Sequence, residues 1–191
     1  MYLVFDTETS NFPNPSLAVN HPDQGRIVQL AWLLLDAEFK EVGAFNSLIH
    51  IGEQVNIAAG AAKAHGITKE KCWQYGVEMP FALRTFLDVY KKAEVVIAHN
   101  IAFDKQLVDL EEKAAFQCST LDWKKGKCTM LATTPICKLI GKYPGKYKWP
   151  KLIEAYRHCF QKDFDGAHDA LADVRATAAV FKWLVTNGHK V

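Results

Sequence analysis

The sequence contains no long apolar segment and little that would cross-link it. None of its apolar runs approaches the roughly 18 consecutive residues that a membrane-spanning helix requires, so we expect no membrane partner. Its five cysteines form no C-x-x-C pair, which favours reduced thiols over a disulfide framework or a zinc site. The N-terminus has no basic segment and reaches an acid at Asp6, which argues against a secretory signal. These absences predict a cytoplasmic protein.

The chain also lacks internal repeats, low-complexity tracts and long linkers. Hydrophobic residues make up 49% of its 191 residues and charged residues 23%, which excludes a disordered chain and a collagen. A chain of this length buries enough apolar surface to fold without cross-links. The formal net charge is only +2, whereas proteins that bind polyanions are usually strongly basic. Composition therefore predicts a single domain over residues 1–191 and does not by itself point to a polyanion partner.

The order of the apolar segments predicts an α/β fold, a mixed β-sheet flanked by helices. Apolar runs at 2–5, 26–35 and 42–51 with short connections indicate an antiparallel N-terminal meander. From Pro80 onward, helical periodicities alternate with a short buried strand, as expected when helices pack on the faces of a sheet that adds parallel strands. The expected helices follow Pro80, span 103–114, follow Pro150 and span 171–185, and the expected strand spans 94–98.

Two acids follow the first predicted strand in the segment Asp6-Thr7-Glu8-Thr9. Residues two apart on a strand point to the same side of the sheet, so the carboxylates of Asp6 and Glu8 converge. Bringing two carboxylates together at the end of an apolar strand is costly unless a cation lies between them. An isolated Asp-x-Glu pair is more often a solvated strand end or a helix cap. Whether Asp6 and Glu8 bind a metal therefore depends on whether further acids lie nearby.

Two further acids and a histidine accompany other predicted elements. Asp104 lies in the first helical turn after the strand at 94–98, and Asp173 lies in the helix that His168 precedes. Each acid alone has a structural alternative, because a first-turn carboxylate stabilises the helix dipole. The candidate metal ligands are Asp6, Glu8, Asp104 and Asp173.

An all-carboxylate set of this kind suits two hard divalent cations, Mg²⁺ or Mn²⁺. Two such ions about 3.5–4 Å apart stabilise both the attacking and the leaving oxygen of an in-line phosphoryl displacement. Histidine side chains titrate near neutral pH, so His168 is a candidate general base that takes the proton from the attacking water. The candidate catalytic residues are His168, Asp6, Glu8, Asp104 and Asp173.

Three segments resemble the motifs of the DEDDh, or DnaQ-like, 3′–5′ exonucleases, which share a ribonuclease H-like fold. Asp6-Thr7-Glu8-Thr9 resembles the first motif, and the segment from His99 to Asp104 resembles the second. His168-x-Ala170-x-x-Asp173 resembles the third, and its histidine distinguishes this branch from the one with a tyrosine there. The motifs have the family's order and separations and span residues 6 to 173. The resemblance implies metal-dependent hydrolysis from the 3′ end that releases nucleoside monophosphates.

The resemblance also implies residues that contact the substrate. The segment His65-Gly66-Ile67-Thr68 is similar to a family segment that lines the pocket for the terminal nucleotide. Two residues have structural alternatives, His65 as a helix-end histidine beside a C-capping glycine and Asn100 as a turn residue. The candidate substrate-binding residues are Thr7, Glu8, Thr9, His65, Asn100 and His168.

Residues 123–153 contain no aspartate or glutamate and many lysines. Lysines neutralise phosphates, and aromatic rings stack on unpaired bases, so this mixture favours binding of a single-stranded polynucleotide. The alternative is an ordinary solvated surface. The residues concerned are Lys124, Lys125, Lys127, Lys138, Lys142, Lys146, Lys148 and Lys151, with Tyr143, Tyr147 and Trp149.

The segment between the first two strands, residues 10–25, is longer than the short turn usual in this family. Its prolines and asparagines predict a loop that leaves directly from the acidic strand. Such a loop either borders the site or is a tolerated surface insertion.

The sequence therefore predicts a 3′–5′ exonuclease acting on single-stranded DNA or on frayed or mismatched 3′ ends, of the proofreading or DNA-repair type. One alternative is a 3′–5′ exoribonuclease that acts on RNA ends or short RNAs. Another is a non-catalytic module of the same fold that binds nucleic acid or a polymerase, although such a module has no use for a general base. The expected partners are a single-stranded 3′ end and either a DNA polymerase or a second copy of the chain.

Overall fold

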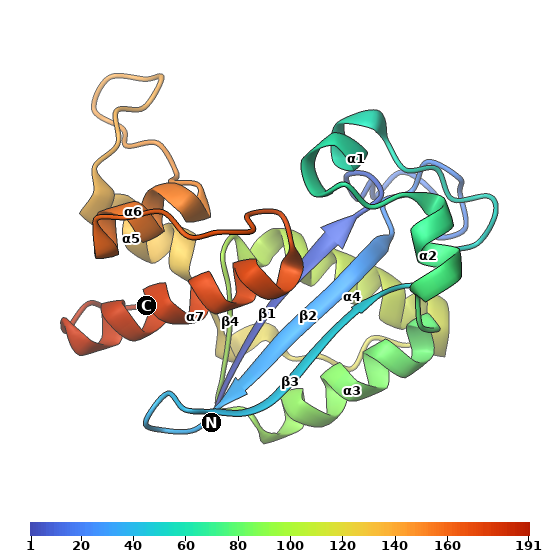
Figure 1. The fold of residues 1–191 in the computed structure, drawn as a ribbon, viewed down its shortest axis with the longest axis horizontal. Coiled ribbons are helices and arrows are strands. Elements are labelled where there is room, and N and C mark those ends of the chain that lie inside the picture. The colour runs from blue at the N-terminus through green and yellow to red at the C-terminus, as the bar shows by residue number, and fades with distance from the viewer.

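The computed structural model describes residues 1–191 and contains one five-stranded mixed sheet (Figure 1). The strands are β1 (Tyr2–Thr9), β2 (Ile27–Leu35), β3 (Glu41–Leu48), β4 (Val95–Ala98) and β5 (Gly126–Cys128). Their order across the sheet is β3-β2-β1-β4-β5. The first three strands pair antiparallel, whereas β4 runs parallel to β1 and β5 runs parallel to β4. The predicted combination of an antiparallel meander with parallel strands is confirmed.

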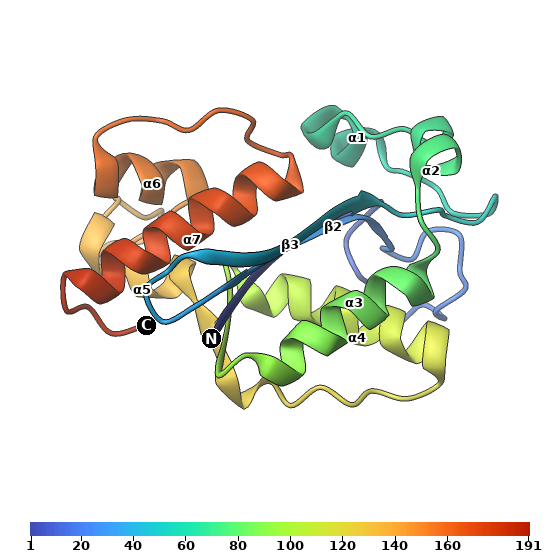
Figure 2. The same ribbon diagram turned by 60° about the horizontal axis from the view of Figure 1, so that its bottom comes forward.

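Helices cover both faces of this sheet, as Figure 2 shows in side view. They are α1 (Ala59–His65), α2 (Lys69–Tyr75), α3 (Met79–Lys92), α4 (Ile101–Phe116), α5 (Thr129–Cys137), α6 (Leu152–Phe160) and α7 (Ala170–Thr186). One face is covered by α3 and α4, and the other by α7, against which α5 and α6 pack. The short helices α1 and α2 lie past the end of the sheet where β1 and β3 finish (Figure 1).

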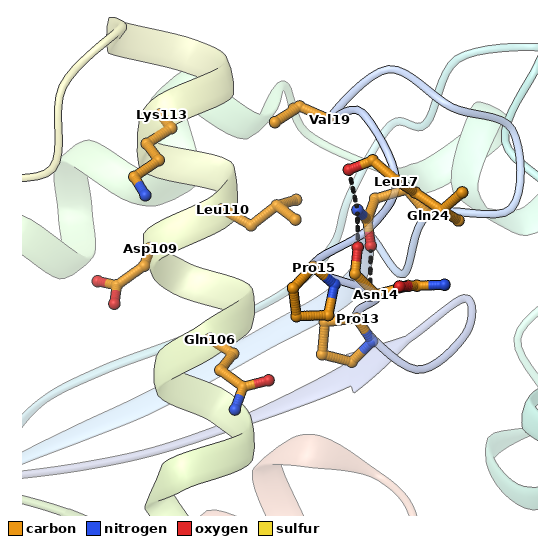
Figure 3. A pocket seen from close by; sticks show the side chains of 10 residues that line it. All are labelled: Pro13, Asn14, Pro15, Leu17, Val19, Gln24, Gln106, Asp109, Leu110 and Lys113. Atoms are coloured by element: carbon orange, nitrogen blue, oxygen red, sulfur yellow. Dashed lines mark hydrogen bonds between the residues drawn. The ribbon is translucent and has the colours of Figure 1, made fainter.

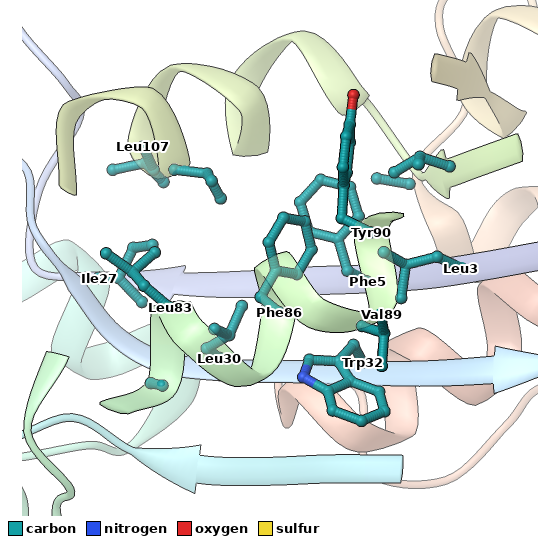
Figure 4. Packing of buried hydrophobic residues seen from close by; sticks show 14 of the residues in the cluster. Leu3, Phe5, Ile27, Leu30, Trp32, Leu83, Phe86, Val89, Tyr90 and Leu107 are labelled. Atoms are coloured by element: carbon teal, nitrogen blue, oxygen red, sulfur yellow. The ribbon is translucent and has the colours of Figure 1, made fainter. Parts of the chain in front are cut away.

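The two faces of β1 contribute to two separate hydrophobic clusters. Leu3 and Phe5 belong to a cluster of 18 buried residues between the sheet and helices α3 and α4 (Figure 4). Within it, the rings of Phe5 and Phe86 lie 5.0 Å apart. Val4 belongs to a cluster of nine residues under α7. Because side chains alternate along a strand, this assignment also decides where the polar residues that follow on β1 point.

Strand β2 is buried over its whole length, as its continuous apolar run predicts. Its start is anchored to α4 by a buried carboxylate, Glu111, which has no exposed surface. Arg26 donates to Glu111 through Nε and Nη2 at 2.8 and 2.6 Å, and the backbone N–H of Ile27 donates to Glu111 Oε1 at 3.0 Å. The charge of Glu111 is thus fully compensated inside the protein.

Several elements differ from the expectation drawn from the sequence. The third strand ends at Leu48 and not at residue 51, and α6 begins at Leu152, two residues after Pro150. Helices α1, α2 and α5 and strand β5 were not expected. Helix α1 buries none of its residues and α5 contains Pro135, so neither shows an apolar stripe. None of the helices combines the length and the apolar character needed to cross a bilayer.

Candidate active site

Asp6 and Glu8 lie on the side of β1 that faces α7. They follow Val4 at intervals of two residues, and Val4 packs under that helix. Asp173 lies in the first turn of α7, and its charge raises the pKa of both Asp6 and Glu8. The structure therefore brings three of the four predicted ligands together, two from a strand and one from a helix.

Asp104 reaches the same place from the opposite face of the sheet. It lies in the first turn of α4 and is buried. Thr7, whose side chain points the other way from Asp6 and Glu8, donates to Asp104 Oδ1 through its hydroxyl at 2.7 Å and its backbone N–H at 3.1 Å. Thr7 thus positions Asp104, and its contact with the substrate stays a prediction.

The start of α7 is held against the sheet by a side chain on β2 that the sequence did not single out. Asp169 caps the helix by accepting from the backbone N–H of Ala172. Gln29 Nε2 donates to Asp169 Oδ2 at 3.1 Å, and Gln29 Oε1 accepts from the backbone N–H of Ala170 at 3.3 Å. Gln29 is paired with Glu8 across the two strands. This clamp places Asp173 beside Glu8, and no local pattern could have revealed it because 140 residues separate Gln29 from Asp169.

His168 stands at the rim of the site, immediately before the capped helix. Its backbone has φ of 70°, in the left-handed region, and its N–H donates to Asp173 Oδ2 at 3.2 Å. The side chain is exposed. Ligand atoms of Glu8, His168 and Asp173 all lie within 4.8 Å of one another. The imidazole is therefore placed where a water molecule bound near the carboxylates can reach it.

The four carboxyl groups all have raised pKa values, chiefly because burial disfavours their charged form. Burial, followed by the charges of Asp173 and Asp104, raises the pKa of Glu8 to about 8. Burial raises the pKa of Asp104 to about 7 although the bonds from Thr7 oppose the shift, and it raises the pKa of Asp173 to about 6. The pKa of Asp6 is also well above its ordinary value, through burial first and then through Asp104 and Asp173.

Such a cluster of carboxylates fits divalent cations. Its carboxylate oxygens are the hard donors that Mg²⁺ and Mn²⁺ prefer, and the His168 imidazole lies beside them. Bound cations would reverse the local sign of the charge and relieve the repulsion that raises the pKa values. The residues present therefore agree with the metal site expected from the sequence.

Metal binding should stabilise this fold more at high pH than at low pH. In the metal-free folded protein Asp173, Asp104 and Glu8 lose their protons near pH 6, 7 and 8, whereas the unfolded chain releases them near pH 4. The folded state therefore binds more protons over this range, and stability falls as the pH rises from about 4 to about 8. Saturating Mg²⁺ should raise the thermal midpoint by about 5–10 °C near pH 8 and by less near pH 5.5, where protons compete. Thermal unfolding by circular dichroism with Mg²⁺ or chelator measures both shifts. Equal shifts at the two pH values contradict the expectation.

A cavity of about 590 Å³ opens beside the carboxylates. Glu8 and His168 line it on the side of the acids, and α1 forms another wall through small residues. Two aromatic residues that the sequence did not single out, Phe12 and Phe103, complete the lining, with their rings 5.9 Å apart and edge to face. Phe12 is 78% exposed, which is unusual for a large apolar side chain and marks it as available to a ligand.

The remaining predicted substrate contacts divide into two groups. Thr9 and His65 both line the cavity, and His65 Nε2 donates to Thr9 O at 3.2 Å. His65 also ends α1 beside Gly66, which has φ of 67°, so it has the structural role of a helix-end residue as well. Asn100 lies outside the cavity lining and takes a left-handed backbone at the start of α4. For Asn100 the turn role is what the structure describes.

Loop 10–25 borders the site and is held in one conformation by Gln24. The side chain of Gln24 is 1% exposed, accepts from the backbone N–H groups of Asn14 and Gly25, and donates to the carbonyls of Asn14 and Leu17. A second hollow of about 360 Å³ separates this loop from α4 (Figure 3). Because Phe12 belongs to the same loop, the loop presents this ring to the cavity.

The comparisons with known proteins agree with this geometry. Residues 3–181 match the family model RNase_T, described as exonuclease, so the chain belongs to this exonuclease family. No curated protein matches the chain.

Solved structures confirm the ribonuclease H-like fold. The nuclease domain of 3'hExo, a DEDDh family member bound to rAMP, has a TM-score of 0.73 and 13% identity over 100% of this chain and 94% of that one. E. coli Exonuclease I with a dA16 oligonucleotide has a TM-score of 0.70 and 21% identity over 97% of this chain. A zinc-bound E. coli ExoI–ssDNA complex has a TM-score of 0.74 and 20% identity over 98% of this chain. This chain spans 40% of the length of both Exonuclease I chains.

Proposed function

We propose that residues 1–191 form a single metal-dependent 3′–5′ exonuclease domain that releases nucleoside 5′-monophosphates, chiefly from single-stranded DNA or from frayed or mismatched 3′ ends. The observation that carries this proposal is the gathering of four carboxylates and His168 beside a cavity of about 590 Å³. A cavity of this size accommodates a small-molecule-sized group such as one nucleotide. Cleavage beside it then removes one residue at a time.

Each residue of the site has a distinct task in this reaction. Asp6, Glu8, Asp104 and Asp173 would hold two Mg²⁺ or Mn²⁺ ions, which supply charge stabilisation for the attacking and leaving oxygens. Thr7 holds Asp104 directly, and Gln29 holds the start of the helix that carries Asp173 by donating to Asp169. His168 takes the proton from the attacking water.

The cavity provides the contacts for the terminal nucleotide. Phe12 and Phe103 offer ring surfaces on which a base stacks, and α1 offers a wall without polar side chains from Ala58, Gly60, Ala61 and Ala64. His65 and Thr9 supply polar groups near the acids. Stacking without hydrogen-bonding side chains on that wall suits any of the bases, as an enzyme that removes successive nucleotides requires.

Two relatives support two substrate classes. Exonuclease I was solved with a DNA oligonucleotide, and the 3'hExo domain with rAMP. DNA is our first candidate substrate because the motifs resemble those of a family that includes proofreading and repair exonucleases. RNA is the second, because the nuclease domain of 3'hExo matches this chain over 94% of that domain's length. The DNA polymerase partner, the homodimer and the cytoplasmic location stay predictions.

A degradation assay tests this proposal. With Mg²⁺, we expect 5′-labelled single-stranded DNA to shorten stepwise from its 3′ end, mismatched duplex DNA to lose its frayed end, and RNA to be cut more slowly. Chelator should stop all three reactions, because the carboxylates alone supply no positive charge. If DNA and RNA both stay intact with Mg²⁺ and with Mn²⁺, the chain is a binding module of this fold and not an enzyme.

A further inference from the structure

Residues 138–151, between α5 and α6, form an arm that projects from the body of the protein (Figure 1). A bridge between Ile140 and Tyr147 and a bond from the N–H of Lys148 to Leu139 O at 2.9 Å join its two sides. The two sides approach closely, since a Cβ on Gly141 would lie 2.3 Å from Lys146 O on the opposite side. The arm therefore has a defined hairpin-like shape of its own.

The surface of the arm is apolar and basic at once. Ile140 is 94% exposed, and Tyr143, Tyr147 and Trp149 are 66%, 50% and 64% exposed. Exposed rings at this density are unusual on a protein surface that contacts only water. The arm also carries five lysines and no acid, namely Lys138, Lys142, Lys146, Lys148 and Lys151.

Two of the other three lysines in the acid-free segment have partners, whereas Lys127 has none. Lys125 Nζ donates to the carbonyls of Tyr90 and Ala93 at the end of α3 and lies 3.8 Å from the Tyr90 ring. Lys124 pairs with Asp122 at 3.5 Å. Within the arm, Lys148 is paired with Glu154 at 2.6 Å. Lys142 and Lys146, in the middle of the arm, are therefore among the lysines that have no acidic partner.

The base of the arm is bonded to the end of β4, where the second motif begins. His99 Nε2 donates to Pro150 O at 3.0 Å, and His99 Nδ1 lies 3.0 Å from Thr129 Oγ1 at the start of α5. In Figure 1 the arm and α1 rise from the same side of the molecule, with the start of α7 between them. A strand whose end enters the cavity under α1 can therefore continue across the start of α7 toward the arm.

We propose that this arm binds the single-stranded polynucleotide upstream of the 3′ end. The inference rests on the proposed exonuclease function and adds a second contact point to it. Lys142 and Lys146 would neutralise backbone phosphates, and Tyr143 and Trp149 would stack on unpaired bases. A second copy of the chain fits the arm less well, because lysine is depleted at the centre of protein interfaces.

Oligonucleotide length is the variable that tests the arm. Binding of single-stranded DNA of about 5 and about 30 nucleotides is measured by fluorescence anisotropy in chelator, so that nothing is cut. One variant carries Lys142→Gln with Lys146→Gln, and another carries Tyr143→Ala with Trp149→Ala. The matched control carries Lys91→Gln with Lys92→Gln, the same charge change on two exposed lysines at the far end of α3.

We expect both arm variants to bind the long strand about tenfold more weakly and the short one unchanged. The lysine variant should also lower the slope of log affinity against log salt by about 1.4, whereas the aromatic variant and the control should leave it unchanged. Unchanged affinity for the long strand in both arm variants overturns the inference. A change of either arm variant from dimer to monomer in sedimentation, without loss of DNA binding, also overturns it. Failure of the unmodified chain to cut any strand with Mg²⁺ overturns the proposed exonuclease function instead, and the binding comparison still decides on the arm.

Discussion

Replacing Asp6 by asparagine is expected to lower the rate of 3′-end hydrolysis by at least about 10³-fold, because metal ions supply several kcal/mol of charge stabilisation to such reactions. Asp6 lies at the centre of the cluster, and its pKa is raised by burial and then by the other three carboxylates. Asparagine keeps the shape of the side chain but removes the charge that holds a cation. Initial rates on a labelled single-stranded substrate, with Mg²⁺ and with Mn²⁺, measure the loss.

Protein stability separates this effect from unfolding. Since the ionised Asp6 is disfavoured in the fold, Asp6→Asn should unfold in chelator at the same temperature as the unmodified chain or higher, and should gain less from Mg²⁺. Asp88→Asn, the same change at an exposed position of α3, should alter neither the rate nor the response to Mg²⁺. Full activity of Asp6→Asn would remove Asp6 from the metal site.

Replacing His168 by asparagine is expected to lower the rate by about 10²–10⁴-fold, the usual contribution of a general base. Asparagine is the informative choice because it tolerates the left-handed backbone at this position, where φ is 70°. Alanine would combine the loss of the imidazole with backbone strain. The rate is measured from acid to alkaline pH, since the loss of a general base should change how the rate depends on pH.

A second measurement shows whether His168 acts as a base or only as a structural residue. Its side chain is exposed, so His168→Asn should change the unfolding temperature little and leave binding of Mg²⁺ nearly intact. His50→Ala, at another exposed histidine, is the control and should keep the full rate. If His168→Asn keeps the pH profile of the unmodified chain, the proton goes to another group.

Four of the five strands could be predicted because their signals are local, whereas the three-residue β5 was not expected. The apolar run of β2 is uninterrupted, and every residue of that strand is buried. The stripe of α7 begins after a good capping residue, Asp169, and ends before Gly188. The convergence of Asp6 and Glu8 follows from the two-residue period of a strand. Helix α1 could not be predicted in this way, because it lies at the edge of the molecule with no buried residue.

For the candidate site, the sequence identified the candidate groups for metal binding and proton transfer better than it identified the residues that position them. The four acids and His168 are close together in the structure, as their motifs indicate. Thr7, however, holds Asp104 through its hydroxyl, and Asn100 starts α4 with a left-handed backbone. These structural roles could not be predicted from the motifs. Phe12 lies in a loop whose shape depends on the buried amide of Gln24, and no spacing in the sequence encodes that.

The sequence by itself determined which chemical groups this protein contains and in what order: an acidic strand end, two helix-borne acids with a histidine, and a lysine-rich segment without acids. Only the tertiary structure decided which of those groups meet and which remain free. It clamps α7 to β2 through Gln29, and it uses Lys125 to cap α3 while it leaves the lysines near the arm's tip without an acidic partner. The physical reason is that side-chain periodicity is a local property of the backbone, whereas hydrogen bonds and ion pairs join residues that are brought together only by packing of the whole chain.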